Sequence, residues 1–158
     1  NVLNSDRVVI LEYHNGTNNA AGIPFRYADI SYEVVSDTCD SVCEDWGQIL
    51  LSRYRFPNYM RDRFNYWGTI EEIKGYDQRL ATRLEMDGVR YIALSKIKYG
   101  NCVIGFVVAE YNEIPNTNKE SIDLRRNTLF EAASRLSVLL SPEHVDEDSG
   151  PIFNEPNR

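Results

Sequence analysis

Glu12 and His14 are the residues whose types and spacing most suggest chemistry. They stand two positions apart near the end of the apolar segment 6–14, which is typical of a β-strand, so both side chains face the same side. A carboxylate beside an imidazole can work as an acid/base pair or help to hold a metal ion, but either role needs further partners. The structural alternative is that the two side chains satisfy each other or cap the turn at Asn15-Gly16.

A pocket would form around this pair if neighbouring strands brought further polar side chains to it. The segments 25–35 and 89–98 have the pattern of strands and carry such residues, and the polar, glycine-containing segment 15–24 is suited to a lid. The expected ligand-binding set is Glu12, His14, Arg26, Tyr32, Tyr91 and Ser95. The sequence assigns no catalytic residue, no metal ligand and no cofactor.

Three cysteines limit the thiol chemistry of the chain. They are too few, and odd in number, for a disulfide framework. Cys102 lies in an apolar run and is expected to be a small buried side chain. Cys39 and Cys43 are four positions apart, which on a helix places both thiols on one face, either as structural thiols or as a redox pair. A zinc site is not expected, because no second Cys/His pair stands at ligand spacing.

Residues 53–69 alternate between aromatic and basic side chains without a clean period. Within an acidic protein this segment is a local exception. One interpretation is a connecting loop whose aromatic rings cover the core. The other is a recognition surface that uses arginine and tyrosine side chains as rigid anchors.

Charge and hydropathy exclude several classes of function. The chain has 17 basic and 24 acidic residues and a net charge of −7, and no basic run reverses that sign locally, so no nucleic-acid partner is expected. No apolar run is long enough to span a bilayer, so membrane contact is expected only through a segment preceding Asn1. Nucleophile-elbow, phosphate-loop and calcium-loop motifs are absent, which favours a protein that is not an enzyme. The sequence assigns no cellular location.

Four strands are indicated by β-rich or apolar segments. The last two are joined as an antiparallel hairpin through Tyr99-Gly100-Asn101. The expected strands cover residues 6–14, 25–35, 89–98 and 102–111.

Three helices are indicated by capping signals and helical spacing. A short helix follows the capping box Ser41–Glu44, a second covers 73–87 and closes at Gly88, and a long one follows the capping box Thr117–Glu120 and ends at Leu140. The chain is therefore expected to form one α+β domain over residues 1–140. The acidic tail 141–158, which contains proline and glycine, is expected to be disordered.

The second half of the chain resembles a GAF domain. The resemblance rests on the order of the elements, on Gly88-Val-Arg-Tyr-Ile-Ala-Leu94 entering the hairpin and on Val103-Ile-Gly-Phe-Val-Val108 leaving it. It implies a three-layer α+β sandwich, in which a central antiparallel sheet carries the terminal helices on one face and the middle helices and a pocket on the other. It also implies that Gly105 allows close packing against a helix, and that the long terminal helix forms a homodimer.

Three functional hypotheses follow. The first is a non-catalytic GAF-like sensor that binds a small molecule, and the second is a ligand-free docking or assembly module that uses the aromatic-basic segment 53–67. The third, implied by the resemblance, is a thiol-dependent reductase of free methionine sulfoxide that uses Cys39 and Cys43, although their surroundings differ from the cysteine motifs of that group. The segments 12–16, 22–25 and 31–33 are also similar to uncharacterised phage-encoded proteins with an N-terminal hydrophobic anchor.

Overall fold

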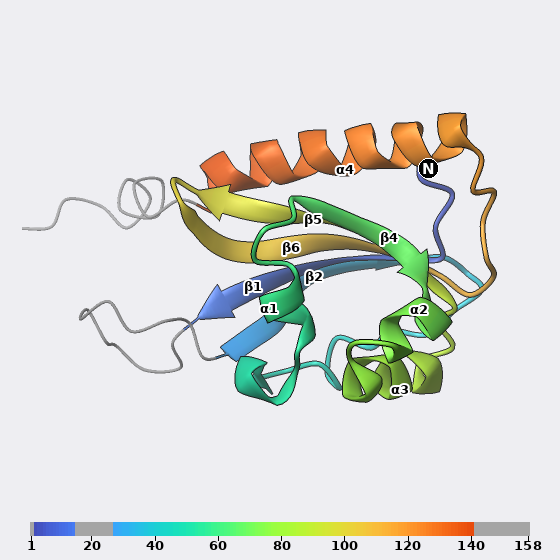
Figure 1. Cartoon of the computed structure of the whole chain (residues 1–158), viewed down its shortest axis with the longest axis horizontal. Helices are drawn as coiled ribbons and strands as arrows, with labels where there is room; N and C mark the ends of the chain where they lie inside the picture. Colours follow the sequence, from blue (N-terminus) through green and yellow to red (C-terminus); the bar gives the residue numbers. More distant parts are fainter. Residues whose placement is uncertain (1, 15–26, 141–158) are drawn as a thin grey trace, which may run out of the picture.

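A six-stranded antiparallel sheet organises the chain (Figure 1). The computed structural model describes residues 2–14 and 27–140. The strands run across the sheet in the order β3-β2-β1-β6-β5-β4, and each neighbouring pair is antiparallel. They are β1 (Arg7–His14), β2 (Tyr27–Val35), β3 (Ile49–Leu50), β4 (Asn65–Thr69), β5 (Tyr91–Tyr99) and β6 (Cys102–Tyr111).

Helices cover the sheet on both sides. The long helix α4 (Lys119–Leu139) lies on one face, and the shorter helices α1, α2 and α3 lie on the other (Figure 1). The predicted α+β sandwich of three layers is thus confirmed. No helix in the described ranges has the length and apolarity needed to cross a bilayer. The short helical elements are η1 (Leu51–Arg53), α1 (Phe56–Tyr59), α2 (Ile70–Lys74) and α3 (Gln78–Met86).

Strand β1 is central because its apolar residues supply both faces of the sheet. Val9, Leu11 and Tyr13 belong to the larger core, between the sheet and α1–α3. Val8 and Ile10 pack into the second core, beneath α4. Odd-numbered and even-numbered residues of β1 thus lie on opposite faces of the sheet, because a strand has a period of two residues. Only the odd-numbered ones face the side that α1–α3 cover.

The hairpin of β5 and β6 is formed as predicted. Tyr99 pairs with Cys102, so Gly100 and Asn101 make the turn, and Gly100 has φ of 58°. The role expected for Gly105 is wrong. A Cβ atom there would collide with the carbonyl of Leu11 on the neighbouring strand, so this glycine lets β6 approach β1 rather than a helix.

The helix predicted after Ser41 is wrong. Residues 43–46 make a single turn, in which the Trp46 amide donates to the Val42 carbonyl at 3.2 Å, and the chain then enters β3. Glu33 on β2 accepts hydrogen bonds from the Ser41 hydroxyl and from the Val42 amide. A side chain from another element therefore binds the Ser41 hydroxyl and the Val42 amide, and holds this segment against β2.

The middle helix is divided in two. Thr69 and Glu72 form a capping box that starts α2 earlier than predicted, and Asp77 caps α3 after a break. The predicted end is confirmed, because Gly88 follows α3 with φ of 79°. The long helix starts one residue later than its capping box predicts, with Asn118 as N-cap.

Candidate functional site

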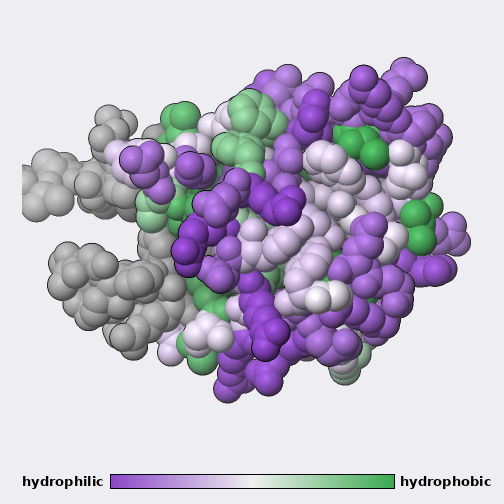
Figure 2. All heavy atoms as spheres, in the orientation of Figure 1, coloured by the Kyte–Doolittle hydropathy of each residue, from purple (hydrophilic) through white to green (hydrophobic). Residues whose placement is uncertain are grey.

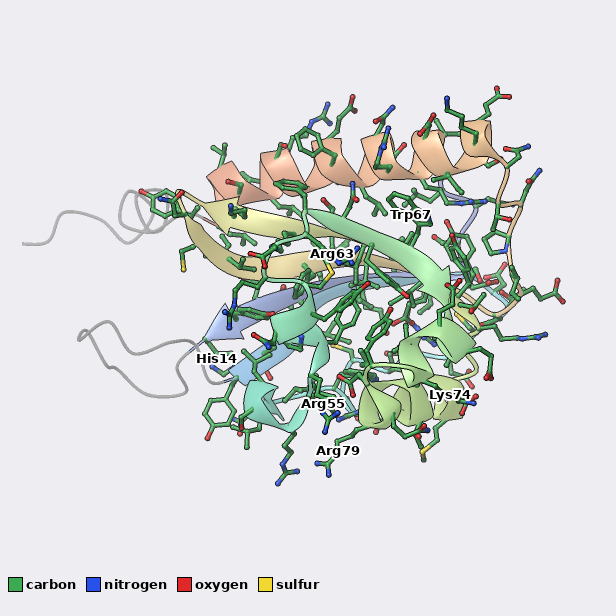
Figure 3. All side chains as sticks on the ribbon, in the orientation of Figure 1. His14, Arg55, Arg63, Trp67, Lys74 and Arg79 are labelled. Atoms are coloured by element: carbon green, nitrogen blue, oxygen red, sulfur yellow. The ribbon has the colours of Figure 1, made fainter. Side chains whose placement is uncertain are left out.

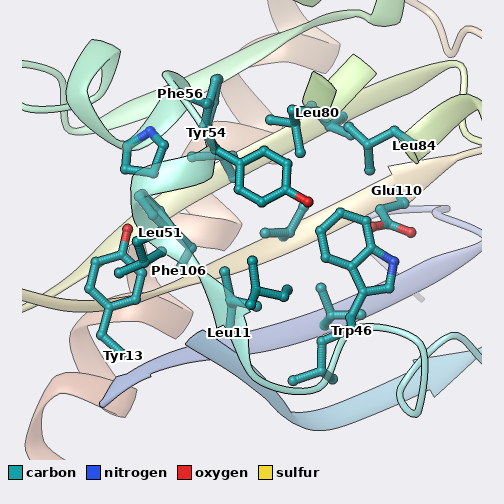
Figure 4. Close-up of a pocket in the computed structure, with 17 residues that line it drawn as sticks. Leu11, Tyr13, Trp46, Leu51, Tyr54, Phe56, Leu80, Leu84, Phe106 and Glu110 are labelled. Atoms are coloured by element: carbon teal, nitrogen blue, oxygen red, sulfur yellow. The ribbon is translucent and has the colours of Figure 1, made fainter. Parts of the chain in front are cut away.

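An apolar cavity of about 90 Å³ lies between the sheet and the segment from Trp46 to α3 (Figure 4). Leu11 and Tyr13 of β1, with Phe106 of β6, form its floor. Trp46, from the turn before β3, and residues of η1, α1 and α3 close over it. Nearly all of the lining is hydrocarbon or aromatic ring, which is the usual character of a small-molecule site.

The roof of the cavity is held to α3 by Arg83. Its guanidinium lies 4.2 Å from the ring centre of Trp46, and its Nη1 donates a hydrogen bond to the Tyr54 hydroxyl at 3.0 Å. Trp46 in turn donates from Nε1 to Asp87 at 2.7 Å. Figure 4 shows the Tyr54 ring lying across the cavity, with its hydroxyl toward Trp46. Because that oxygen accepts from Arg83, its own proton remains available for a ligand.

A buried ion pair forms the polar end of the cavity. Glu110 lines it and accepts a hydrogen bond from Arg7, its partner in the register of β6 with β1. The Arg7 guanidinium also donates to the Asp40 carbonyl at 2.7 Å and lies 3.6 Å from the Glu33 carboxylate. Burial raises the pKa of the Glu110 carboxyl, and the nearby Arg7 opposes this rise.

The structure places the predicted ligand-binding residues away from this cavity. Glu12 and His14 occupy even positions of β1 and so share a face, as predicted, but it is the face of Val8 and Ile10. None of the described members of the set is among the residues lining the cavity. Arg26, with the predicted lid 15–24, lies outside the described residues.

The described side chains of the predicted set contact other residues, are exposed, or are buried beneath α4. His14 contacts the carboxylate of Asp29 on β2, so the histidine has a carboxylate partner other than Glu12, and its ring stacks on Tyr27 at 5.8 Å (Figure 3). Tyr32 is 59% exposed. Tyr91 and Ser95 are buried on the face of β5 that α4 covers.

The cysteines also lie outside the cavity lining. Cys102 is exposed at the hairpin, so the prediction that it is buried is wrong. Cys39 and Cys43 lie in the segment between β2 and β3, and their thiols donate to the carbonyls of Asp6 and Ile30 at 3.2 and 3.6 Å. Among the described residues no group of three His, Cys, Asp or Glu side chains is placed to hold a metal ion.

The aromatic-basic segment 53–67 places part of its aromatic side chains in the core, as one interpretation predicts, and leaves its arginines exposed. Phe56 and Met60 are buried in the core, and the rings of Tyr59 and Tyr76 stack at 4.2 Å. The arginines of the segment are exposed, among them Arg55 and Arg63, which Figure 3 labels, and Trp67 is 37% exposed. In Figure 2 this face of the molecule is largely hydrophilic around a paler centre.

Comparison with known proteins assigns the fold. No family model and no curated protein match the sequence. The blue-light absorbing form of the PixJ GAF domain of Thermosynechococcus elongatus matches with a TM-score of 0.67 at 17% identity, over 94% of this chain and 81% of that one. This chain has the GAF fold.

Other solved structures agree with the GAF fold. The phycocyanobilin-bound GAF domain from a cyanobacterial phytochrome matches with a TM-score of 0.64 at 12% identity, over 86% of this chain and 76% of that one. A domain of a putative two-component sensor histidine kinase protein from Sinorhizobium meliloti 1021 matches with a TM-score of 0.61 at 11% identity. The match covers 94% of this chain and 87% of that one. At such identities the matches establish the GAF fold, and function must be argued from the site.

The cavity residues were not found from the sequence, although two signals were present. Arg7, Val9 and Leu11 alternate along β1, so the charged side chain of Arg7 lies on the same face as the apolar side chains of the core. Glu110 stands near the end of the other central strand. Arg7 begins β1 and Glu110 lies near the end of the antiparallel strand β6, so the two side chains could have been predicted to meet as a buried ion pair.

Proposed function

We propose that this chain is a non-catalytic sensory domain that binds a compact, largely apolar molecule in the cavity over β1, β5 and β6. The observation that carries this proposal is the cavity itself, with aromatic walls and polar groups at Tyr54 and Glu110. Such a site suits a ligand whose hydrocarbon part is buried and whose one polar group is recognised. The GAF fold supports the proposal, because two matched structures are named as bilin-bound or light-absorbing domains.

The size of the cavity selects the ligand class. Its volume of about 90 Å³ is below the range of roughly 300–1,000 Å³ for pockets that hold drug-sized ligands. Its lining residues also include no cysteine to attach a chromophore. We therefore propose a ligand no larger than a single small aromatic ring system, rather than a tetrapyrrole; benzene and indole serve as probes of this class. The Tyr54 hydroxyl would donate a hydrogen bond to an acceptor atom on such a ligand.

Occupancy of the cavity provides the sensory response in this proposal. Trp46, Tyr54 and Arg83 form one connected group that joins the roof to α3. A ligand beneath the roof adds contacts to Trp46 and Tyr54 that the empty cavity lacks, so the bound state favours this arrangement over looser ones. The signal would then pass to α3 through Arg83.

Two neighbouring residues on β1 offer a matched test. Leu11 lines the cavity and Ile10 faces α4, and both are half-buried. In a thermal-shift titration with benzene and with indole, wild type and Ile10→Trp should gain in melting temperature, whereas Leu11→Trp, whose indole fills the site, should not. The proposal fails if wild type does not respond to either probe, or if Leu11→Trp responds as strongly as Ile10→Trp.

A docking surface is the second candidate function. Phe64 and Trp67, from the aromatic-basic segment, are 41% and 37% exposed, and the Phe64 ring lies 5.2 Å from that of Phe130 on α4. Large aromatic side chains that remain in solvent are typical anchors of protein interfaces. In this second proposal the Phe64–Phe130 pair, with Trp67 on the edge strand β4, would be the anchors of the interface.

A homodimer through α4 remains part of this proposal. Leu124 and Val138 on α4 are 52% and 67% exposed. Light scattering after size exclusion should give a dimer mass for wild type and a monomer mass for Val138→Lys. A monomeric wild type at micromolar concentration would contradict the dimer.

A further inference from the structure

The junction of η1, α1, α2 and α3 forms a second hollow, on the outside of the sandwich. Its volume is about 600 Å³, and it does not share lining residues with the apolar cavity. Figure 3 shows Arg55, Arg79 and Lys74 in this region. The polar side chains that matter here are Ser52, Arg53, Arg55, Lys74, Gln78 and Arg79.

Three of the four cations in this hollow have no counter-ion among residues 2–14 and 27–140. Arg53, Arg55 and Arg79 are exposed, and within the described part of the chain none of them makes an ion pair. Lys74 is engaged by Glu71 and by Glu85, at 2.9 and 2.6 Å. A concave cluster of uncompensated guanidinium groups is unexpected on a protein of net charge −7, where acidic partners are plentiful.

Asp77, the acid in the hollow, makes no ion pair with these cations among the described residues. Asp77 is 2% exposed, and one of its carboxylate oxygens accepts hydrogen bonds from the amides of Arg55 and Phe56, both at 2.8 Å. Its other oxygen caps α3 by accepting from the Leu80 amide at 3.0 Å. The carboxylate is thus turned toward backbone donors, and it fixes the positions of the two segments that carry Arg55 and Arg79.

The backbone adds to the positive potential. The helix α3 begins at Gln78, and its N-terminus faces the hollow that Gln78 and Arg79 line. The first amides of a helix have no carbonyl partner within it, and the helix dipole places partial positive charge there. Asp77 already caps the Leu80 amide of this end, so the amides of Gln78 and Arg79 are the ones that can face a ligand, and the guanidinium cluster is the independent feature.

We propose that this hollow binds a phosphate-bearing small molecule. Guanidinium groups match the paired oxygens of phosphate in a bidentate manner, and several of them around one concavity suit a group with more than one negative charge. Ser52 and the amides of Gln78 and Arg79 would donate further hydrogen bonds to the phosphate oxygens. The site is separate from the apolar cavity, so this inference stands whether or not a ligand binds there.

Isothermal titration calorimetry of the full chain tests the proposal, with inorganic pyrophosphate as probe and citrate as a polyanion without phosphorus. The test variant is Arg55→Gln with Arg79→Gln. Its control is Arg126→Gln with Arg135→Gln, which makes the same change in net charge on α4, on the other side of the sheet. All four arginines are exposed, so neither change removes core packing. Circular dichroism of both variants serves as the check that they are folded.

Wild type should bind pyrophosphate at about 100 mM salt, where purely long-range attraction is largely screened. The hollow variant should lose at least about tenfold in affinity, and the α4 control should lose less than about twofold. Three results would overturn the proposal: no binding of pyrophosphate by wild type at millimolar concentration, equal losses in the two variants, or binding of citrate as tight as that of pyrophosphate.

Discussion

Replacing Arg7 with methionine probes the ion pair at the polar end of the cavity. Arg7 is 2% exposed, and it contacts the carboxylates of Glu110 and Glu33. Methionine is also long and flexible but brings neither charge nor donor, so two buried carboxylates would lose their counter-ion. Breaking a buried pair in this way costs about 3–5 kcal/mol. We expect the free energy of unfolding at pH 7, measured by urea denaturation, to fall by about 4 kcal/mol.

The loss of unfolding free energy in Arg7→Met should depend on pH, and the titration of Glu110 determines whether it grows or shrinks as pH rises. Burial raises the pKa of Glu110, and Arg7 opposes the rise. Without Arg7 the pKa of Glu110 in the folded protein rises further above its unfolded value of about 4.3. A carboxyl whose pKa is raised by folding contributes stability that is present below the unfolded pKa and is lost as pH rises through the folded pKa. Arg7→Met should therefore be more damaging at pH 8 than at pH 5.

Two further variants complete the experiment. Adding Glu110→Gln to Arg7→Met removes one buried carboxylate, so it should restore about 2 kcal/mol and flatten the pH dependence. Arg126→Met is the control, because Arg126 is 43% exposed in its pair with Asp123 and should contribute less than about 0.5 kcal/mol. The reasoning is refuted if Arg7→Met costs under about 1 kcal/mol, or if its effect is the same at both pH values.

Three other predictions concern stability and use urea denaturation. Asp77→Ala leaves three backbone amides without their acceptor and should cost about 3 kcal/mol, with Asp77→Asn recovering part of the loss. Gly105→Ala should cost about 3 kcal/mol or more, because the new Cβ atom meets the rigid backbone of β1. Its control, Gly100→Ala, should cost about 1 kcal/mol, because the new Cβ atom meets only open space and the cost comes from the positive φ. A chain ending at Leu140 should keep the unfolding midpoint of the full chain, whereas a large shift would show that residues 141–158 belong to the folding unit.

Much of the fold could be predicted because its signals are local. Strands β5 and β6 each carry a long apolar run, and Gly100-Asn101 between them permits a tight turn, so the hairpin needs no information from elsewhere in the chain. The end of α3 at Gly88 is local in the same sense. The helix expected after Ser41 is absent, and contacts from outside the segment shape the chain there: Glu33, on another strand, binds the Ser41 hydroxyl and the Val42 amide.

The candidate site was harder to predict because it depends on which face of the sheet remains open. The period of a strand correctly places Glu12 and His14 on one side, but it does not say whether a helix packs tightly over that side. Here α4 covers the face on which Tyr91 and Ser95 lie, and the cavity opens on the opposite face. The resemblance to GAF domains indicated a pocket beneath the middle helices. It did not give the pairing register of the strands, which determines which side chains line that pocket.

Nuclear magnetic resonance of side-chain methyl groups during titration with indole tests the central claim most directly. The methyl groups of Ile49, Leu84 and Leu94 face the cavity, and those of Ile97 on β5 and Leu129 on α4 lie in the core between the sheet and α4. We predict saturable shifts confined to the cavity methyl groups, and their loss in Leu11→Trp. No shifts up to the solubility of indole, or shifts mainly beneath α4, would contradict a ligand site in this cavity.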